Sequence, residues 1–344
     1  MVAIGRSRFA GGLLKFVLLG APLIPIIGAG CIPPPLPDNL EADAPHRSLL
    51  REAPRAVVRQ EDGVLDAAWL EITRDDGKAV GGYVSLQKSP RGALVLLVDG
   101  ASTFQETGSD AQALTFHRDF GADLRAFGFR TWSLSVQECG TAYGQDDVDD
   151  LVAVLDWLDD VGLEALNVER VYIVGYSTGA TVTQIASQRR KVTAAVSLAG
   201  LSQPDQLEEL YDVYRWVSDL YPHNAGLCKL ADTLAFYGPP GSMAWEALDS
   251  VSHVTEFKHP MLFVHGMRDI IYFPENTLAM EMAYLTARGR RAGVPEMTFK
   301  YLPEGEHYTV RSDPAVRLSV IRWLETFEPD PSPVPLNGIP GLKE

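Results

Sequence analysis

Short apolar runs alternate with longer amphipathic segments along most of the chain, and this alternation limits the available folds more than any other feature. The runs expected to be strands are GALVLLVDG (92–100), FRTWSLSV (129–136), RVYIVGY (170–176), AAVSLAG (194–200), PMLFVHG (260–266) and MTFKYL (297–302). The segments expected to be helices are 114–128, 146–162, 178–190, 275–290 and 314–327. Continuous apolar runs are typical of strands buried on both faces of a parallel sheet. Because βαβ crossovers place helices on both faces, the sequence predicts an α/β fold with a mostly parallel, twisted sheet.

Two further strands are expected before residue 92, where apolar and polar residues alternate on either side of Asp76-Gly77. That dipeptide favours a tight turn. The two strands would therefore form an antiparallel hairpin at one edge of the sheet.

The alternation stops between 202 and about 258, where aromatic residues are frequent, and this predicts a helical cap inserted into the domain. Its rings would either cover a site and select the substrate, or only pack the cap onto the sheet. With the insertion included, the α/β domain is expected to span 54–328, followed by a flexible, Pro-rich tail over 329–344.

The first thirty residues resemble an export signal, because three basic residues precede a short apolar stretch that prolines interrupt. Small residues stand directly before Cys31, as in the bacterial lipoprotein signal, in which this cysteine takes a lipid and becomes the mature N-terminus. The prediction is a signal peptide over 1–30, a Pro-rich linker over 31–53 and a membrane anchor at Cys31. An ordinary cleavable signal peptide, with a periplasmic or secreted product, is the alternative. In both cases the chain is exported to the cell envelope or beyond.

Export also affects how the other two cysteines are interpreted. If Cys31 is lipidated, Cys139 and Cys228 remain as an even pair in an oxidising compartment, where a disulfide is stable. Two free thiols are the alternative, because the sequence gives no distance between the two residues.

The composition excludes several classes of function. A formal net charge of −15 would repel polyphosphates, so no nucleic acid partner is expected. The three cysteines and seven histidines show no spacing typical of metal ligands, so no metal or cofactor is expected.

The segment VGYSTGA (174–180) lies between an expected buried strand and an expected helix. A chain that turns from strand to helix within two or three residues needs small neighbours, and Gly175 and Gly179 leave that space around Ser177. The hydroxyl would then project from a strained turn at a helix N-terminus, with the amide of Thr178 directed at any oxyanion beside it. Ser177 is therefore the predicted nucleophile.

A serine hydroxyl needs a base within hydrogen-bond reach, itself oriented by an acid. Among the seven histidines, His307 stands in a Gly-containing loop directly after the last expected strand. That position is at the carboxyl edge of the sheet, where Ser177 also emerges and where open α/β sheets bind ligands. His307 is the predicted base.

The acid is expected from another strand end. Asp269 stands in the loop after the strand that ends near His265. Glu304 and Glu306 are the alternatives, but they share the loop of the histidine, from which its Nδ1 is awkward to reach.

The chain order Ser177, Asp269, His307 and the segment His265-Gly266-x-x-Asp269 together resemble the α/β-hydrolase superfamily over about 60–328. The resemblance extends to its serine esterases and its prolyl-oligopeptidase-like peptidases. It implies the α/β-hydrolase fold and a Ser-His-Asp triad.

In this superfamily a loop amide after the third strand commonly donates to the oxyanion, within a His-Gly segment. This chain has Asp99-Gly100 there, so the resemblance implies the main-chain amide of Ala101 as the second donor, beside that of Thr178. An ionised Asp99 near an oxyanion is unfavourable unless its charge is paired or points away.

The expected function is therefore that of a serine hydrolase that cleaves carboxylic esters through an acyl-enzyme, with a small-molecule or peptide acyl substrate. Ester cleavage is the first choice because the layout has no propeller-like gate. A peptidase or aminoacyl hydrolase of the prolyl-oligopeptidase type is the alternative among enzymes. From another class, the chain could be a non-catalytic surface lipoprotein that keeps the fold.

Overall fold

The computed structural model describes part of the chain, within the larger of its two compact units, residues 41–344. The described ranges are 56–59, 66–87, 89–100, 109–135, 145–205, 211–220, 243–290 and 293–329. The parts of the predictions that lie outside them are the signal peptide (1–30), the linker (31–53), residues 206–210 and 221–242 of the cap, residues 330–344 of the tail, Cys31, Ala101, Cys139 and Cys228.

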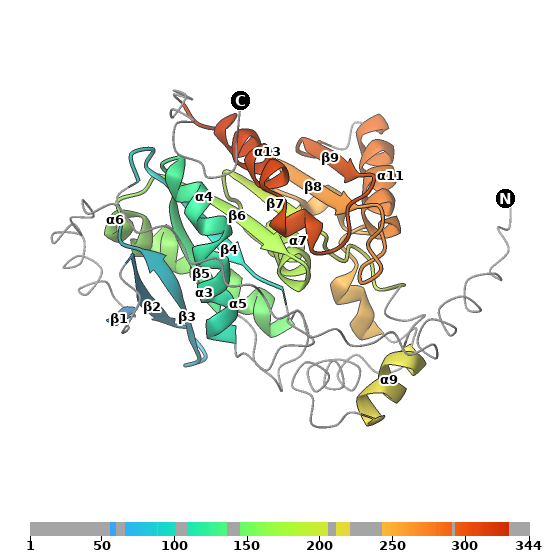
Figure 1. The fold of residues 1–344 in the computed structure, drawn as a ribbon, viewed down its shortest axis with the longest axis horizontal. Helices are drawn as coiled ribbons and strands as arrows, with labels where there is room; N and C mark the ends of the chain where they lie inside the picture. The colour runs from blue at the N-terminus through green and yellow to red at the C-terminus, as the bar shows by residue number, and fades with distance from the viewer. Residues whose placement is uncertain are drawn as a thin grey trace, which may run out of the picture. The chain divides into compact units, whose positions relative to one another are not determined.

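A single sheet of nine strands runs through the described residues in the order β1-β2-β3-β5-β4-β6-β7-β8-β9 (Figure 1). Its strands are β1 (Ala56–Arg59), β2 (Ala67–Thr73), β3 (Ala79–Ser85), β4 (Ala93–Val98), β5 (Arg130–Ser135), β6 (Arg170–Tyr176), β7 (Ala194–Leu198), β8 (Met261–Gly266) and β9 (Met297–Leu302). Pairing is antiparallel from β1 to β3 and between β3 and β5, and parallel across all remaining neighbours. The predicted mostly parallel sheet with an antiparallel edge is confirmed.

Helices follow most of the strands. They are α3 (Ser109–Arg118), α4 (Phe120–Ala126), α5 (Gln145–Trp157), the π-helical turn η1 (Leu158–Gly162), α6 (Leu163–Leu166), α7 (Thr178–Arg189), α9 (Tyr211–Leu220), the 3₁₀ turns η2 (Met243–Leu248) and η3 (Val254–Glu256), α11 (Glu275–Gly289), α12 (Thr309–Ser312) and α13 (Pro314–Glu325). Within the described ranges, none of them combines the length and the apolarity that a membrane span needs.

Each face of the sheet is covered by its own hydrophobic core. The residues of β4 contribute to both cores, which explains why this strand is apolar at every position. Leu94 and Leu96 belong to a cluster with residues of α5, α7 and α11, whereas Val95 and Leu97 belong to a second cluster with residues of α3, α4 and α13. Successive side chains of a strand point to opposite faces. Both faces of β4 are therefore buried, and the side chains on each face must be apolar.

Part of the predicted cap is described, as residues 202–205, 211–220 and 243–258. Trp245 and Phe257 are buried in the core that α5, α7 and α11 share, so these rings pack the insertion onto the sheet. Trp216 on α9 is half exposed. The limits of the cap stay a prediction.

Candidate active site

Ser177 occupies the turn between β6 and α7, with a φ of 56° and a ψ of −121°. A Cβ added at Gly175 would lie 2.3 Å from the carbonyl oxygen of Gly179, and one added at Gly179 would lie 2.1 Å from that of Val98. Real Cβ atoms do not approach other atoms so closely, so both positions require glycine. The short turn predicted from the sequence is present, and its two glycines supply the space.

The structure brings together the three residues that the sequence singled out. His307, in the loop between β9 and α12, places Nε2 2.8 Å from the Ser177 Oγ. Its Nδ1 lies 2.7 Å from Oδ2 of Asp269, in the loop between β8 and α11. Because a carboxylate only accepts hydrogen bonds, Nδ1 carries the imidazole proton and Nε2 is free to accept from the serine hydroxyl. All three side chains are nearly buried.

Asp269 is held by more than the histidine. Its Oδ1 accepts hydrogen bonds from the backbone amides of Ile271, at 2.8 Å, and Tyr272, at 3.0 Å. Nε2 of the buried His265 lies 3.3 Å from Oδ2. Burial alone would raise the pKa of Asp269, but the hydrogen bonds from His265 and His307 outweigh it and lower that pKa. The carboxylate is thus ionised and fixed toward His307.

The two alternative acids lie elsewhere. Glu304 and Glu306 are exposed on the loop of the histidine, and Glu304 forms an ion pair with Arg268. The imidazole Nδ1 points at Asp269 instead.

Three tyrosine rings surround the imidazole of His307, and sequence reasoning did not identify them. The ring centroids of Tyr176, Tyr272 and Tyr308 lie 5.2, 5.6 and 5.8 Å from that of His307. Tyr176 and Tyr308 directly adjoin Ser177 and His307 in the sequence, and that adjacency is a signal that could have found them. The hydroxyl of Tyr272 also lies 3.4 Å from that of Thr178.

One of the two predicted oxyanion donors lies in the described part of the chain. Thr178 is the first residue of α7, where a backbone N–H has no acceptor within the helix. Ala101 lies outside the described residues, but Gly100 before it passes close to the nucleophile. A Cβ at Gly100 would lie 2.4 Å from that of Ser177, so the segment directly after β4 packs against the serine.

Asp99, the residue that departs from the superfamily pattern, has its charge paired. Arg311 on α12 places Nη1 2.9 and 3.0 Å from the two carboxylate oxygens. An acid at this position must have its charge paired or pointing away from the oxyanion, and the ion pair with Arg311 meets this requirement. Sequence reasoning did not identify Arg311.

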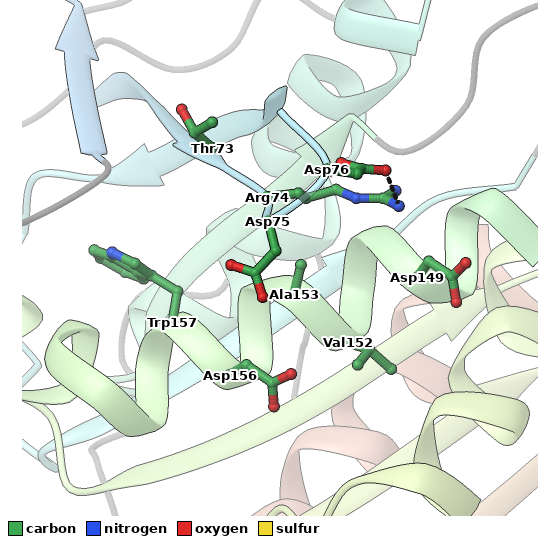
Figure 2. Close-up of a pocket in the computed structure, with 9 residues that line it drawn as sticks. All are labelled: Thr73, Arg74, Asp75, Asp76, Asp149, Val152, Ala153, Asp156 and Trp157. Carbon is green, nitrogen blue, oxygen red and sulfur yellow. Dashed lines mark hydrogen bonds and ion pairs between the residues drawn. The ribbon is translucent and has the colours of Figure 1, made fainter. Parts of the chain in front are cut away.

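A pocket of about 250 Å³ opens away from these residues, between the β2–β3 turn and α5 (Figure 2). It is lined by Thr73, Arg74, Asp75, Asp76, Asp149, Val152, Ala153, Asp156 and Trp157. None of the predicted site residues belongs to this lining. Across the described ranges, no three His, Cys, Asp or Glu side chains are grouped so that they could hold a metal ion.

Comparison with known families gives one match. The sequence profile of the prolyl oligopeptidase family matches residues 136–327, which is more than half of the chain and includes Ser177, Asp269 and His307. Comparison with curated protein sequences gave no match.

Solved structures with a similar fold include esterases and peptidases. A bifunctional protein of Bacteroides eggerthii superposes with a TM-score of 0.57 at 17% identity, over 78% of this chain and 36% of that one. A Pyrococcus furiosus esterase gives 0.53 at 14%, over 78% and 97%. Dipeptidyl peptidase 4 of Porphyromonas gingivalis gives 0.51 at 13%, over 76% and 35%.

This chain therefore spans about a third of the Bacteroides protein and nearly all of the Pyrococcus esterase. At such identities the likeness establishes the fold, which is the α/β-hydrolase fold that the sequence predicted. With more than half of its residues matched by the profile, and with a fold shared by esterases and peptidases, the chain belongs to the prolyl oligopeptidase family.

Proposed function

We propose that the protein is a serine hydrolase that cleaves carboxylic esters through an acyl-enzyme intermediate. The observation that carries the proposal is the hydrogen-bond chain from Ser177 through His307 to Asp269, at 2.8 and 2.7 Å, beginning at a strained turn. A nucleophile, a base and an orienting acid in this order are what acyl transfer requires.

In the proposed reaction, Nε2 of His307 takes the hydroxyl proton as the Ser177 Oγ bonds to the substrate carbonyl carbon. Asp269 stabilises the imidazolium that forms. The amides of Thr178 and Ala101 would donate hydrogen bonds to the oxyanion. When the intermediate collapses, the ester C–O bond breaks, and His307 returns the proton to the departing alcohol. Water, activated by His307, then releases the acid and restores the Ser177 hydroxyl.

The surroundings of the site support an uncharged, apolar group on the substrate. Ile270, next to Asp269, is 77% exposed, and Tyr308, next to His307, is 61% exposed. Met267 on the same loop as Ile270 is also exposed. Apolar side chains that face solvent beside a reaction centre gain free energy when a ligand covers them. An aliphatic or aromatic acyl or alcohol group would provide that cover.

Esterases are also among the structures of similar fold. The chain matches 97% of the length of the Pyrococcus furiosus esterase and 91% of esterase B from Lactobacillus rhamnosis, at TM-scores of 0.53 in both cases.

Peptide or aminoacyl cleavage is the second candidate, because the profile that matches is that of the prolyl oligopeptidase family. The chemistry at Ser177 would be the same, with an amine in place of the alcohol as the leaving group. The two candidates differ in which substrates reach the transition state.

The test is a panel of p-nitrophenyl esters of increasing acyl length and a panel of aminoacyl anilides, with fluorophosphonate labelling of the serine. Ser177→Ala should abolish labelling, and Asp269→Asn should lower kcat/KM by about 10³- to 10⁴-fold. Ser319→Ala is the control, because its hydroxyl donates within its own helix to the Val316 carbonyl. Faster turnover of the anilides would replace the ester proposal by the peptidase. A folded protein that resists labelling would be a non-catalytic member of the family.

We also propose that the protein is exported and anchored to a membrane through a lipid on Cys31, as residues 1–31 predict. The intact mass of protein extracted from membranes should show a diacylglyceryl-modified Cys31 as its first residue. An unmodified Cys31 would rule out the anchor. Thiol counting under denaturing, non-reducing conditions would distinguish a Cys139–Cys228 disulfide from two free thiols.

A further inference from the structure

Asp99 stands at the end of β4, where a charged side chain is unexpected. It is 6% exposed and follows six apolar residues that are all buried. The amide of Gly100 donates a hydrogen bond of 2.7 Å to its Oδ1. Burial raises the pKa of Asp99 to about 6, even though Arg311 and the Gly100 amide act against this shift. A buried carboxylate of this kind stays charged at neutral pH only with a cation beside it.

Arg311 supplies that cation from a distant part of the chain. It lies on α12, four residues after His307, and its Nη1 contacts both oxygens of Asp99 at 2.9 and 3.0 Å. Its guanidinium carbon lies 4.7 Å from the ring centroid of Phe116 and 5.5 Å from that of Tyr176. A planar guanidinium bound by an acid and covered by two rings has little freedom to move.

Asp99 and Arg311 each contact a residue that adjoins Ser177. Gly100, bound to the Asp99 carboxylate, packs against Ser177. Tyr176, which the guanidinium covers, directly precedes Ser177, and its ring centroid lies 5.2 Å from that of His307. The Asp99–Arg311 pair is thus one contact away from both the serine and the histidine.

We propose that Asp99 and Arg311 are positioning residues that fix the end of β4 and the loop of His307 relative to Ser177. Neither touches the reacting atoms in this proposal. The pair sets the distance between nucleophile and base, and removing it lets the His307 loop move away from the serine. For its kinetic consequence the inference rests on the proposed hydrolase function.

The test compares Arg311→Met with the matched control Arg322→Met. Arg322 is also an arginine over a phenylalanine, 5.1 Å from the centroid of Phe127, and it pairs with the buried Glu325 at 2.6 Å. It lies near the C-terminal end of α13, away from His307. Arg322→Met removes an ion pair and one ring contact, and Arg311→Met removes a second ring contact and a 3.9 Å ion pair with Asp119 besides. A purely structural role therefore predicts a loss of stability in both variants and no selective fall in kcat for Arg311→Met.

On a p-nitrophenyl ester, Arg311→Met should lower kcat by about 10- to 100-fold and change KM by less than about three-fold, because geometry rather than binding is lost. Arg322→Met should leave both constants within about two-fold. Arg311→Lys keeps the charge but not the planar stacking, and its kcat should fall between those of the wild type and Arg311→Met. It also serves as the second variant if Arg311→Met does not fold. In a double-mutant cycle with Asp99→Asn, the effects on kcat should not add, because the two residues act as one unit.

A second readout does not depend on turnover. The proton on Nδ1 of His307 should give a low-field NMR resonance that disappears in Asp269→Asn. Arg311→Met, or Arg311→Lys in its place, should shift or broaden it, and Arg322→Met should not. An inactive wild type would overturn the proposed hydrolase while leaving this measurement to decide the pair. An unchanged resonance, or a kcat in the Arg311 variants equal to that of Arg322→Met, would overturn the positioning role.

Discussion

Ser177 has a positive φ of 56°, a conformation that residues other than glycine rarely adopt. It persists because its surroundings fix it: the Ser177 amide donates to the Leu198 carbonyl at 2.9 Å, and its own carbonyl accepts from the Ala180 amide at 3.0 Å. Gly179 lets α7 approach the end of β4 closely. The strained conformation of Ser177 therefore depends on the absence of a side chain at Gly179.

The substitution Gly179→Ala tests this dependence. The added methyl group would lie 2.1 Å from the Val98 oxygen and 2.5 Å from that of Asp99, both of them backbone atoms. We expect the free energy of unfolding to fall by about 3 kcal/mol, because β4 or α7 must shift. Chemical denaturation measures this change, and fluorophosphonate labelling should slow with it.

Gly289→Ala is the control for that variant. No atom lies within 4 Å of a Cβ added there, at the last residue of α11. We expect no loss of stability and a gain of up to about 1 kcal/mol. Equal stability of the two alanine variants would show that the elbow has more room than the structure indicates.

Some residues of the candidate site could be predicted from the sequence and others could not. Ser177 and His307 could be found because each stands at a strand end, in a local pattern of glycines or loop residues. Arg311 could not, because its contact with Asp99 joins residues 212 positions apart. A buried acid at the end of β4 required a cation, but nothing local indicated which of the chain's 30 lysines and arginines would meet it.

Among the secondary-structure elements, those in continuous apolar runs were predicted best. The strand expected over 170–176 is β6 to the residue, because buried strands have sharp apolar limits. β1 was not predicted, since its four residues are alternately half-buried and exposed and too few to show a pattern. The single helix expected over 114–128 is wrong. The chain forms α3 and α4, which meet at Asp119, where φ is −86° and ψ is −87°.

The same pair of helices is tied to β2 by Asp66, which directly precedes that strand. Its Oδ2 lies 2.9 Å from Nη2 of Arg125 on α4 and 3.2 Å from Nε2 of the buried His117 on α3. The hydrogen bond from His117 is the main cause that lowers the pKa of Asp66 to about 2, and burial opposes it. Burial lowers the pKa of His117 itself, so its imidazole is neutral at pH 7 and donates without a charge.

A folded pKa below the unfolded value of 3.8 means that ionised Asp66 stabilises the fold at pH values above about 4. This stability is lost as the pH falls toward about 2. Asp66→Asn should therefore lower the free energy of unfolding by about 2 kcal/mol at pH 7, from the size of the shift. The difference in free energy of unfolding between Asp66→Asn and the wild type should become smaller when urea denaturation is repeated at pH 3.

Glu71→Gln on β2 is the matched control, because its partner Arg59 is largely exposed and their ion pair, at 2.8 Å, is screened by water. We expect it to change stability by less than about 0.5 kcal/mol at either pH. A constant gap for Asp66→Asn between pH 7 and pH 3 would contradict a contribution from its charge.

At the scale of the whole molecule, Glu328, near the end of the described residues, binds to the beginning of the central strand β6. Glu328, after α13, accepts a hydrogen bond of 2.5 Å from the Tyr172 hydroxyl and forms an ion pair of 3.1 Å with Arg170. Arg170 is the first residue of β6, and Ser177 follows its last residue. A strand of seven residues spans about 20 Å. The contacts of Glu328 and the proposed nucleophile therefore lie at opposite ends of the same strand.

This separation predicts that Glu328→Gln weakens the fold without changing the reaction. Arg170 would lose its buried negative partner, and one of the two acceptor oxygens that it shares with Tyr172 would become an NH2 donor, so the free energy of unfolding should fall by about 2–3 kcal/mol. Turnover of a p-nitrophenyl ester should stay within about two-fold of the wild type at temperatures where the variant is folded. Glu169→Gln is the control, because Glu169 is 82% exposed and pairs with the same arginine at 3.5 Å. Its effect on stability should be less than about 0.5 kcal/mol. A fall in kcat for Glu328→Gln at full folding would mean that the two ends of β6 are coupled through the sheet.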